Sequence, residues 1–162
     1  MLKNNKYYFI PVLNVDGLAY IEENHSSGDK FKIVDKRKNM DGSATGDCDG
    51  TTLGVDLNRN YDASFNINSE YKSSIDPCFE FYAGKQPFSE PESQAVKNLL
   101  QQHAGEIKFV INFHSNGNSF IWPFNGEEKN SLNEKEPAVM NVLQDVVNNA
   151  IFPPNLVTGN AF

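Results

Sequence analysis

Runs of apolar residues define most of the elements that the chain predicts. Tyr7–Leu13 is almost wholly apolar, which is typical of a buried strand, and Pro11 within it is expected at a bulge or an edge because proline cannot donate to the ladder. Asn14–Gly17 follows as a turn signal. Ile107–Phe113 predicts a strand covered on both faces, and Ser119–Pro123 predicts a further strand.

Two longer segments carry apolar residues at helical spacing. Ser89–His103 opens with a capping-box pattern, in which Ser89 is the predicted N-cap and Glu92 reaches back to it. Glu134–Asn149 predicts a second helix, and Leu18–Glu23 a short one. The order strand, helix, strand, strand, helix predicts an α/β sandwich.

Residues 25–71 are rich in Gly, Asp, Asn, Ser and Lys and show little periodicity, and so long an irregular stretch is usually functional. Within it, Gly54–Tyr61 places Arg59 between two asparagines, and an Arg fork flanked by amides suits a bidentate grip on a carboxylate. The later apolar run ends at His114, which would deliver an imidazole for a metal or catalytic site. Together these features indicate an enzyme that reads the free end of a peptide.

Composition and charge narrow the class of protein. The 162 residues are 39% hydrophobic and 12% aromatic, as expected for one globular domain. A net charge of -7 argues against a nucleic-acid partner, and no apolar run reaches the roughly 20 residues of a membrane span. No signal peptide is visible before the apolar run at Tyr7, which suggests that the chain begins inside a larger domain.

Cys48 and Cys78 lie in polar, loop-like segments and form no CxxC pair, which argues against a structural zinc knot. A disulfide between them and a pair of free thiols are both compatible with the sequence. The disulfide would indicate a secreted protein or another oxidising compartment.

In its ordered set of motifs, the chain resembles the zinc metallocarboxypeptidases of the carboxypeptidase A/B type. The matching segments are Ile10–Gly17, Arg37–Asn39, Gly54–Tyr61, Pro77–Cys78 with Tyr82–Gly84, Phe88–Glu92 and Phe113–Ser115. The GVDLNRN stretch is the most specific of them, and the set covers nearly the whole chain. The resemblance implies a mixed twisted sheet between helices, truncated at both ends, with residues 1–162 as the central portion of one catalytic domain.

The resemblance also implies roles for individual residues. His114 corresponds to the third ligand of one zinc ion, and Arg59, assisted by Asn58, to the clamp for the C-terminal carboxylate of a peptide substrate. Arg37 corresponds to the residue that polarises the scissile carbonyl and stabilises the oxyanion. In the family, the zinc lowers the pKa of a bound water and a glutamate acts as general base.

Other parts of the family pattern are missing. In the family, the first two zinc ligands come from an HxxE motif upstream of the strand that Ile10–Gly17 matches, so two ligands are expected from outside this chain. The general-base Glu lies on a later segment. His103 and Glu106 do read HxxE, but they lie downstream of the Gly54–Tyr61 segment, in the wrong order for the family. They also lie where a helix ends, where the dipole favours a histidine and Gly105 is the expected C-cap. The isolated chain is therefore predicted to be inactive. The alternative is a non-catalytic module that binds peptide C-termini or a partner subunit.

Each proposed site residue also has a plain structural interpretation. Arg59 could pair with Asp56 or Asp62 in a loop, and His114 could be a core histidine. Arg37 lies in the charged run of residues 35–39, and such a run usually forms a solvated face.

Overall fold

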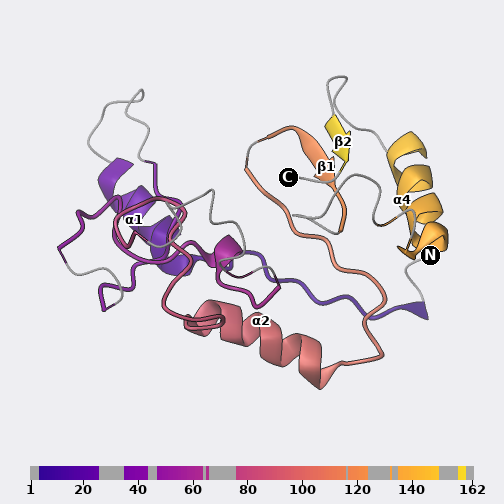
Figure 1. The fold of residues 1–162 in the computed structure, drawn as a ribbon, viewed down its shortest axis with the longest axis horizontal. Coiled ribbons are helices and arrows are strands. Elements are labelled where there is room, and N and C mark those ends of the chain that lie inside the picture. The colour runs from indigo at the N-terminus through magenta and orange to yellow at the C-terminus, as the bar shows by residue number, and fades with distance from the viewer. Residues whose placement is uncertain are drawn as a thin grey trace. The chain divides into compact units, whose positions relative to one another are not determined.

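The computed structural model describes residues 4–25, 35–43, 47–63, 65, 76–115, 117–123, 132 and 135–149, and the backbone of 157–159. The chain divides into two compact units, residues 1–108 and 109–162 (Figure 1). The described elements are α1 (Val15–His25), the 3-10 helix η2 (Leu57–Arg59), α2 (Pro91–Gln102), β1 (Ser119–Ile121), α4 (Pro137–Asn149) and β2 (Val157–Gly159). None of the helices among these residues is long and apolar enough to cross a bilayer.

Helix α1 begins directly after Asn14, where the sequence predicts a turn. The Asn14 side-chain oxygen accepts a hydrogen bond from the Gly17 N–H at 2.9 Å, which satisfies one of the donors that a helix start leaves unpaired. Asp16 in the first turn and His25 in the last turn complement the helix dipole. The short helix predicted at Leu18–Glu23 is confirmed, and it is longer than predicted because Asn14 caps it.

Helix α2 confirms the helix predicted over residues 89–103, although it starts differently. Glu90 is the N-cap without a side-chain capping bond, and Pro91 occupies the first helical position, where a missing N–H leaves no partner unsatisfied. The Ser89 hydroxyl donates instead to the Glu90 carboxylate at 2.6 Å and accepts from the Asn60 amide at 2.8 Å. The predicted capping box is therefore wrong, because Ser89 is engaged by tertiary partners.

The strands predicted at Tyr7–Leu13 and Ile107–Phe113 are not formed in the described part of the chain, where neither run is paired with a strand. Their side chains are mostly exposed, with Phe9 at 81% and Phe113 at 87% of full accessibility. A strand exists only through hydrogen bonds to a neighbour, and an apolar run does not specify which segment supplies them. These two runs accordingly stay outside regular structure.

In the second unit, β1 and β2 pair in parallel, with Ser119 opposite Val157 and Ile121 opposite Gly159. The strand predicted at Ser119–Pro123 is thus confirmed over its first three residues. Parallel neighbours need a crossover connection, and the connecting segment here contains α4.

Helix α4 confirms the second long helix, with Pro137 at its start and Asn149 at its end. Glu134, the predicted first residue, lies outside the described residues. Of the predicted apolar face, Leu143 is buried, whereas Val139, Val142 and Val146 are exposed within this unit.

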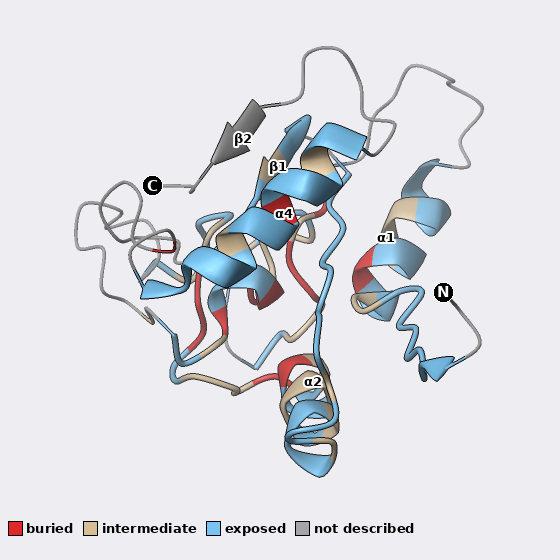
Figure 2. Ribbon diagram, turned by 90° about the vertical axis from the view of Figure 1, so that its right-hand side faces the viewer, coloured by how far each residue is buried: buried red, intermediate tan, exposed pale blue. Residues whose placement is uncertain are grey.

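The buried centre of the first unit is unusually polar. Val55, Leu57, Tyr82 and Ala83 are its apolar members. The buried polar side chains are Lys36, Lys38, Asn39, Asp56, Asn60, Glu90 and Ser93. Figure 2 shows that much of this buried material lies in irregular segments, whereas α2 and α4 are largely exposed. Hydrogen bonds between loops therefore organise this unit as much as apolar packing does.

Candidate functional site

The Gly54–Tyr61 segment is held by hydrogen bonds from both sides. The Val55 N–H donates to the Asn39 side-chain oxygen at 2.8 Å, and the Asn39 N–H donates to the Val55 carbonyl at 3.0 Å. On the other side, the Asp56 N–H donates to the Tyr82 carbonyl at 2.8 Å. Gly54 has a φ of 98°, and a Cβ there would collide with the backbone of Asn39.

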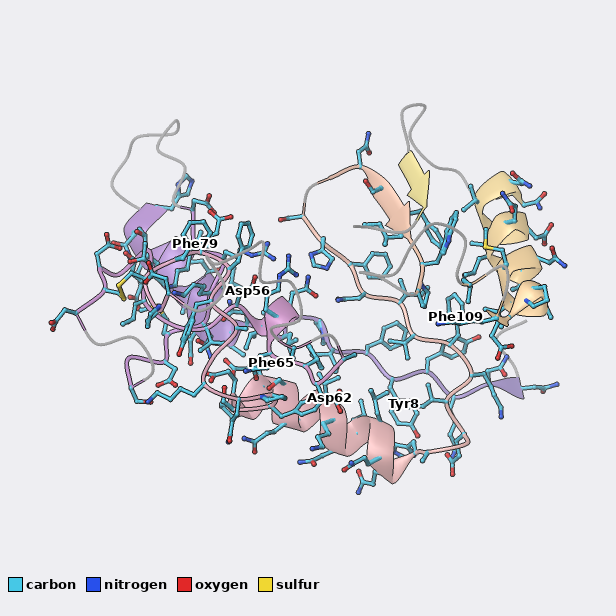
Figure 3. The ribbon with its side chains drawn as sticks, in the orientation of Figure 1. Tyr8, Asp56, Asp62, Phe65, Phe79 and Phe109 are labelled. Atoms are coloured by element: carbon cyan, nitrogen blue, oxygen red, sulfur yellow. A yellow bond between two sulfur atoms is a disulfide. The ribbon has the colours of Figure 1, made fainter. Side chains whose placement is uncertain are left out.

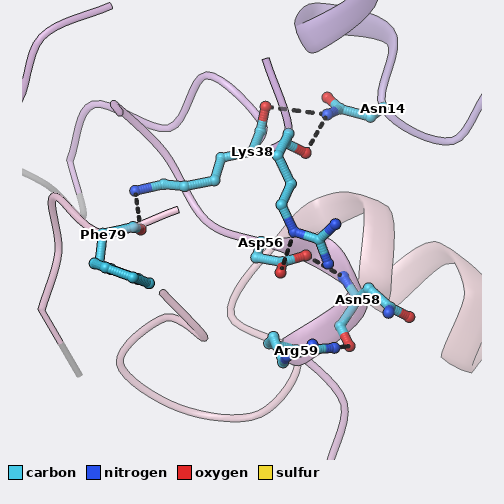
Figure 4. A network of polar contacts seen from close by, with 7 residues as sticks. Asn14, Lys38, Asp56, Asn58, Arg59 and Phe79 are labelled. Atoms are coloured by element: carbon cyan, nitrogen blue, oxygen red, sulfur yellow. Dashed lines mark hydrogen bonds and ion pairs between the residues drawn. The ribbon is translucent and has the colours of Figure 1, made fainter. Parts of the chain in front are cut away.

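Asp56, labelled in Figure 3, connects two of the predicted site residues, as the dashed lines of Figure 4 show. One carboxylate oxygen accepts the Asn58 N–H at 3.0 Å and caps η2, while the other accepts the Arg37 Nε–H at 2.7 Å. Asp56 is only 2% exposed, so this pair is screened less than a surface ion pair. The loop pairing considered for Arg59 is therefore wrong for Asp56, whose arginine partner is Arg37.

Arg59 itself is exposed at the end of η2. The only hydrogen bond of its guanidinium group within the described residues is a local one, from Nη1 to the Asn58 carbonyl at 3.3 Å. Arg37 donates through Nε alone in the same residues, and its side chain is 30% exposed. Both guanidinium groups therefore keep N–H donors available for a ligand such as a carboxylate.

The two asparagines beside Arg59 have different surroundings. Asn58 is exposed, whereas Asn60 is fully buried. The Asn60 amide donates to the Ala83 carbonyl at 2.8 Å, the Gln86 carbonyl at 3.1 Å and the Ser89 hydroxyl at 2.8 Å. Its oxygen accepts from the Glu90 N–H and the Ser93 hydroxyl. The interpretation that amides on both sides of Arg59 grip a ligand is therefore wrong for Asn60, which joins η2 to the start of α2.

Two lysines flank Arg37, and both are buried, so the charged run is not a solvated face. The Lys38 ammonium donates to the Pro77 carbonyl at 2.7 Å and the Phe79 carbonyl at 3.1 Å (Figure 4). The Lys36 ammonium donates to the carbonyls of Gly50, Thr51 and Leu53. Burial lowers the pKa of Lys36 to about 8, with the nearby Lys38 charge adding to the effect, and burial also lowers the pKa of Lys38.

A disulfide joins the two loops that these lysines reach. Cys48 and Cys78 are bonded, with their Cα atoms 5.2 Å apart, which decides between the two alternatives left open by the sequence. Asn14 adds a further connection, since its amide donates to the Lys38 carbonyl at 3.1 Å. The backbone that carries Arg37 is therefore fixed by two ammonium groups, an amide and a nearby covalent bond.

His114 lies in the second unit, exposed and outside regular structure. The described residues contain no group of three His, Cys, Asp or Glu side chains that could hold a metal ion, so they do not form a zinc site by themselves. His103 lies 3.2 Å from the Tyr8 hydroxyl and 3.4 Å from the Glu106 carboxylate at the end of α2. His103 is itself the C-cap of α2, where the dipole favours it, and Gly105, the expected C-cap, follows two residues later with a φ of 84°.

The guanidinium groups of Arg37 and Arg59 therefore lie on one hydrogen-bonded scaffold. A family profile described as zinc carboxypeptidase matches residues 1–152. Mast cell carboxypeptidase A of Homo sapiens is 34% identical over 138 residues, covering 85% of this chain and 30% of that protein. Carboxypeptidase B of Bos taurus is 32% identical over 130 residues, covering 80% of this chain and 28% of that protein. The chain belongs to the zinc carboxypeptidase family, and it spans less than a third of the length of these two relatives.

Solved structures give the same assignment. Carboxypeptidase A from Helicoverpa armigera superposes with a TM-score of 0.63 at 27% identity, covering 94% of this chain and 34% of that chain. Thrombin activatable fibrinolysis inhibitor superposes with a TM-score of 0.57 at 25% identity. The chain therefore shares the α/β fold of carboxypeptidases.

Proposed function

We propose that residues 1–162 are the central portion of one metallocarboxypeptidase catalytic domain, which removes C-terminal residues from peptides. In the whole domain, a mixed twisted sheet between helices would include the two unpaired apolar runs as strands. Their exposure supports this proposal, because large apolar side chains such as Phe9 and Phe113 are usually covered in a complete domain. Family membership and coverage of less than a third of the relatives support it as well.

The main support for this function is that Arg37 and Arg59 lie on one hydrogen-bonded framework, in which Asp56 binds Arg37 and caps the 3-10 helix that contains Arg59. In this proposal Arg59, with Asn58, binds the terminal carboxylate of the peptide, because its exposed fork matches two carboxylate oxygens. Arg37 polarises the carbonyl of the scissile bond, and Asp56 restrains its guanidinium through a single donor. Such donors stabilise developing negative charge best when they are oriented beforehand.

In the whole domain, His114 would be one ligand of a zinc ion, and two further ligands would come from outside this chain. The described residues alone do not fit the metal, so no step of the reaction is assigned to it here. Elemental analysis of the purified chain, with His114→Ala as control, measures this directly. We expect well under one zinc per chain. Near one zinc, lost in the variant, would show that the chain supplies a complete site.

A non-catalytic module that binds peptide C-termini, or a partner subunit, is the second candidate. One observation favours it for the chain by itself: the residues proposed for the carboxylate clamp all belong to the first unit, whereas the described residues contain no group that could hold a metal ion. Both candidates require the clamp, and they differ in catalysis. Zinc-dependent trimming of peptide C-termini by the purified 162-residue chain would contradict the expectation that it is inactive.

Calorimetric titration with acetyl-alanyl-alanine and with its C-terminal amide tests the clamp. We expect the free acid to bind and the amide to bind far more weakly. Arg59→Lys keeps the charge but loses the fork, and should weaken binding about tenfold, the scale of one charge-assisted hydrogen bond. Lys85→Arg, the reverse exchange at an exposed cation of the same unit, also keeps the charge and is the control, which should leave binding unchanged. Equal affinity for acid and amide would overturn the proposed function.

A further inference from the structure

Arg37 and Arg59 share one aromatic neighbour. The guanidinium carbon of Arg37 lies 4.8 Å from the centroid of the Phe81 ring, and that of Arg59 lies 5.6 Å from the same centroid. Both distances are within the range of cation–π attraction. We propose that Phe81 is a positioning residue, whose ring orients both guanidinium groups for the carboxylate and carbonyl of a peptide C-terminus. This inference rests on the proposed function of the two arginines.

An aromatic ring is well suited to this task. It attracts the face of a guanidinium group and consumes none of its five N–H donors, which lie in the guanidinium plane. An acidic partner would instead occupy the donors that a ligand needs. Asp56 takes only the Nε–H of Arg37, so ring and carboxylate together restrain that side chain and leave its terminal nitrogens available. Arg59 has no acidic partner within the described residues, so Phe81 is its main restraint there.

The backbone that carries Phe81 is itself fixed on both sides. On the preceding side, the Phe79 carbonyl accepts hydrogen bonds from the Lys38 ammonium at 3.1 Å and the Tyr82 N–H at 3.2 Å, and Cys78 is in the disulfide. On the following side, the Tyr82 carbonyl accepts the Asp56 N–H. The ring therefore belongs to the same hydrogen-bonded framework as η2, which is the condition for orienting a group on that helix.

A purely packing role for Phe81 makes a different prediction. The ring also contacts Phe79, with centroids 5.7 Å apart, and leucine could satisfy such an apolar contact. If Phe81 only packs, Phe81→Leu should be close to neutral for binding. If it orients guanidinium groups, only an aromatic replacement should preserve the site. Phe79→Leu is the matched control, because Phe79 lies two residues away and shows no guanidinium contact in the described residues.

The first measurement needs no ligand. In nitrogen–proton correlation spectra of the 162-residue chain, the Nε–Hε resonances of Arg37 and Arg59, assigned with Arg37→Lys and Arg59→Lys, report the ring current of Phe81. We expect both resonances to move in Phe81→Leu, and to stay near their original positions in Phe81→Tyr and Phe79→Leu. Unchanged resonances in Phe81→Leu, with the fold intact by circular dichroism, would overturn the inference.

The second measurement is the titration with acetyl-alanyl-alanine. We expect Phe81→Leu to bind about three- to tenfold more weakly, the scale of one or two exposed cation–π contacts, and Phe81→Tyr to restore the affinity. Loss in Leu without rescue by Tyr, or no loss in Leu, would contradict the positioning role. If the unsubstituted chain fails to distinguish the acid from its amide, the proposed function fails, while the resonance shifts still decide whether the Phe81 ring lies against both guanidinium groups.

Discussion

Substitution of the two asparagines on either side of Arg59 should affect different properties: Asn60 the stability of the fold, and Asn58 the binding of a peptide C-terminus. Asn60 is fully buried and its side chain makes five hydrogen bonds to Ala83, Gln86, Ser89, Glu90 and Ser93. Asn60→Ala would leave several of these partners unsatisfied at the start of α2. Each buried unsatisfied group costs about 1–3 kcal/mol, and water entering the vacated space would offset part of the loss.

We therefore expect Asn60→Ala to lower the free energy of unfolding by about 3–5 kcal/mol, a large share of the roughly 5–15 kcal/mol typical of a domain. Asn58→Ala is the matched control, since the Asn58 side chain is exposed. It should change the free energy of unfolding by less than about 0.5 kcal/mol, yet weaken binding of acetyl-alanyl-alanine.

Urea denaturation, which leaves ion pairs unscreened, measures both variants, with equal m-values as the check that the transitions are comparable. A loss below about 1 kcal/mol for Asn60→Ala, or equal losses for the two variants, would refute the central role given to the Asn60 amide.

Two further predictions concern the loops around Arg37. Replacing both Cys48 and Cys78 by alanine should lower the free energy of unfolding by about 3–4 kcal/mol, the loop-closure value for a sequence separation of 30. Urea denaturation measures this loss, with the reduced chain alongside for comparison. A loss under about 1 kcal/mol would show that the two lysine ammonium groups hold the loops without the disulfide. The free energy of unfolding should also rise between about pH 8 and pH 10, because the pKa of Lys36 is lowered to about 8 in the folded state, so that the unfolded chain binds more protons in this window. Lys38, whose pKa is also lowered, acts in the same direction, and the nearby Asp49 charge opposes the effect on Lys36. Lys36→Met should flatten the rise, and an identical slope in that variant would contradict the assignment to Lys36.

Predictions from the sequence succeeded where neighbouring residues decide the structure. The helix at Pro91–Gln102 follows from a proline start and apolar spacing, and the helix at Pro137–Asn149 from spacing alone. Arg59, which the Gly54–Tyr61 motif singled out as a ligand-binding residue, is exposed, and its binding role stays a prediction. Phe81 was missed, because nothing local in the sequence links an aromatic residue to guanidinium groups more than 20 positions away.

Contacts between segments that are distant in the sequence were decided only by the tertiary structure. The apolar run at Tyr7–Leu13 has the composition of a strand, but strand formation depends on a neighbour that composition does not name. The charged run around Arg37 reads as solvated, yet its lysines are buried because carbonyls from loops up to 41 residues away satisfy them. The sequence by itself determined the family, the helices and the residues for which a binding role is proposed. The tertiary structure decided which of those residues are exposed and which hold the others in place, because burial and hydrogen bonding are properties of the assembled chain.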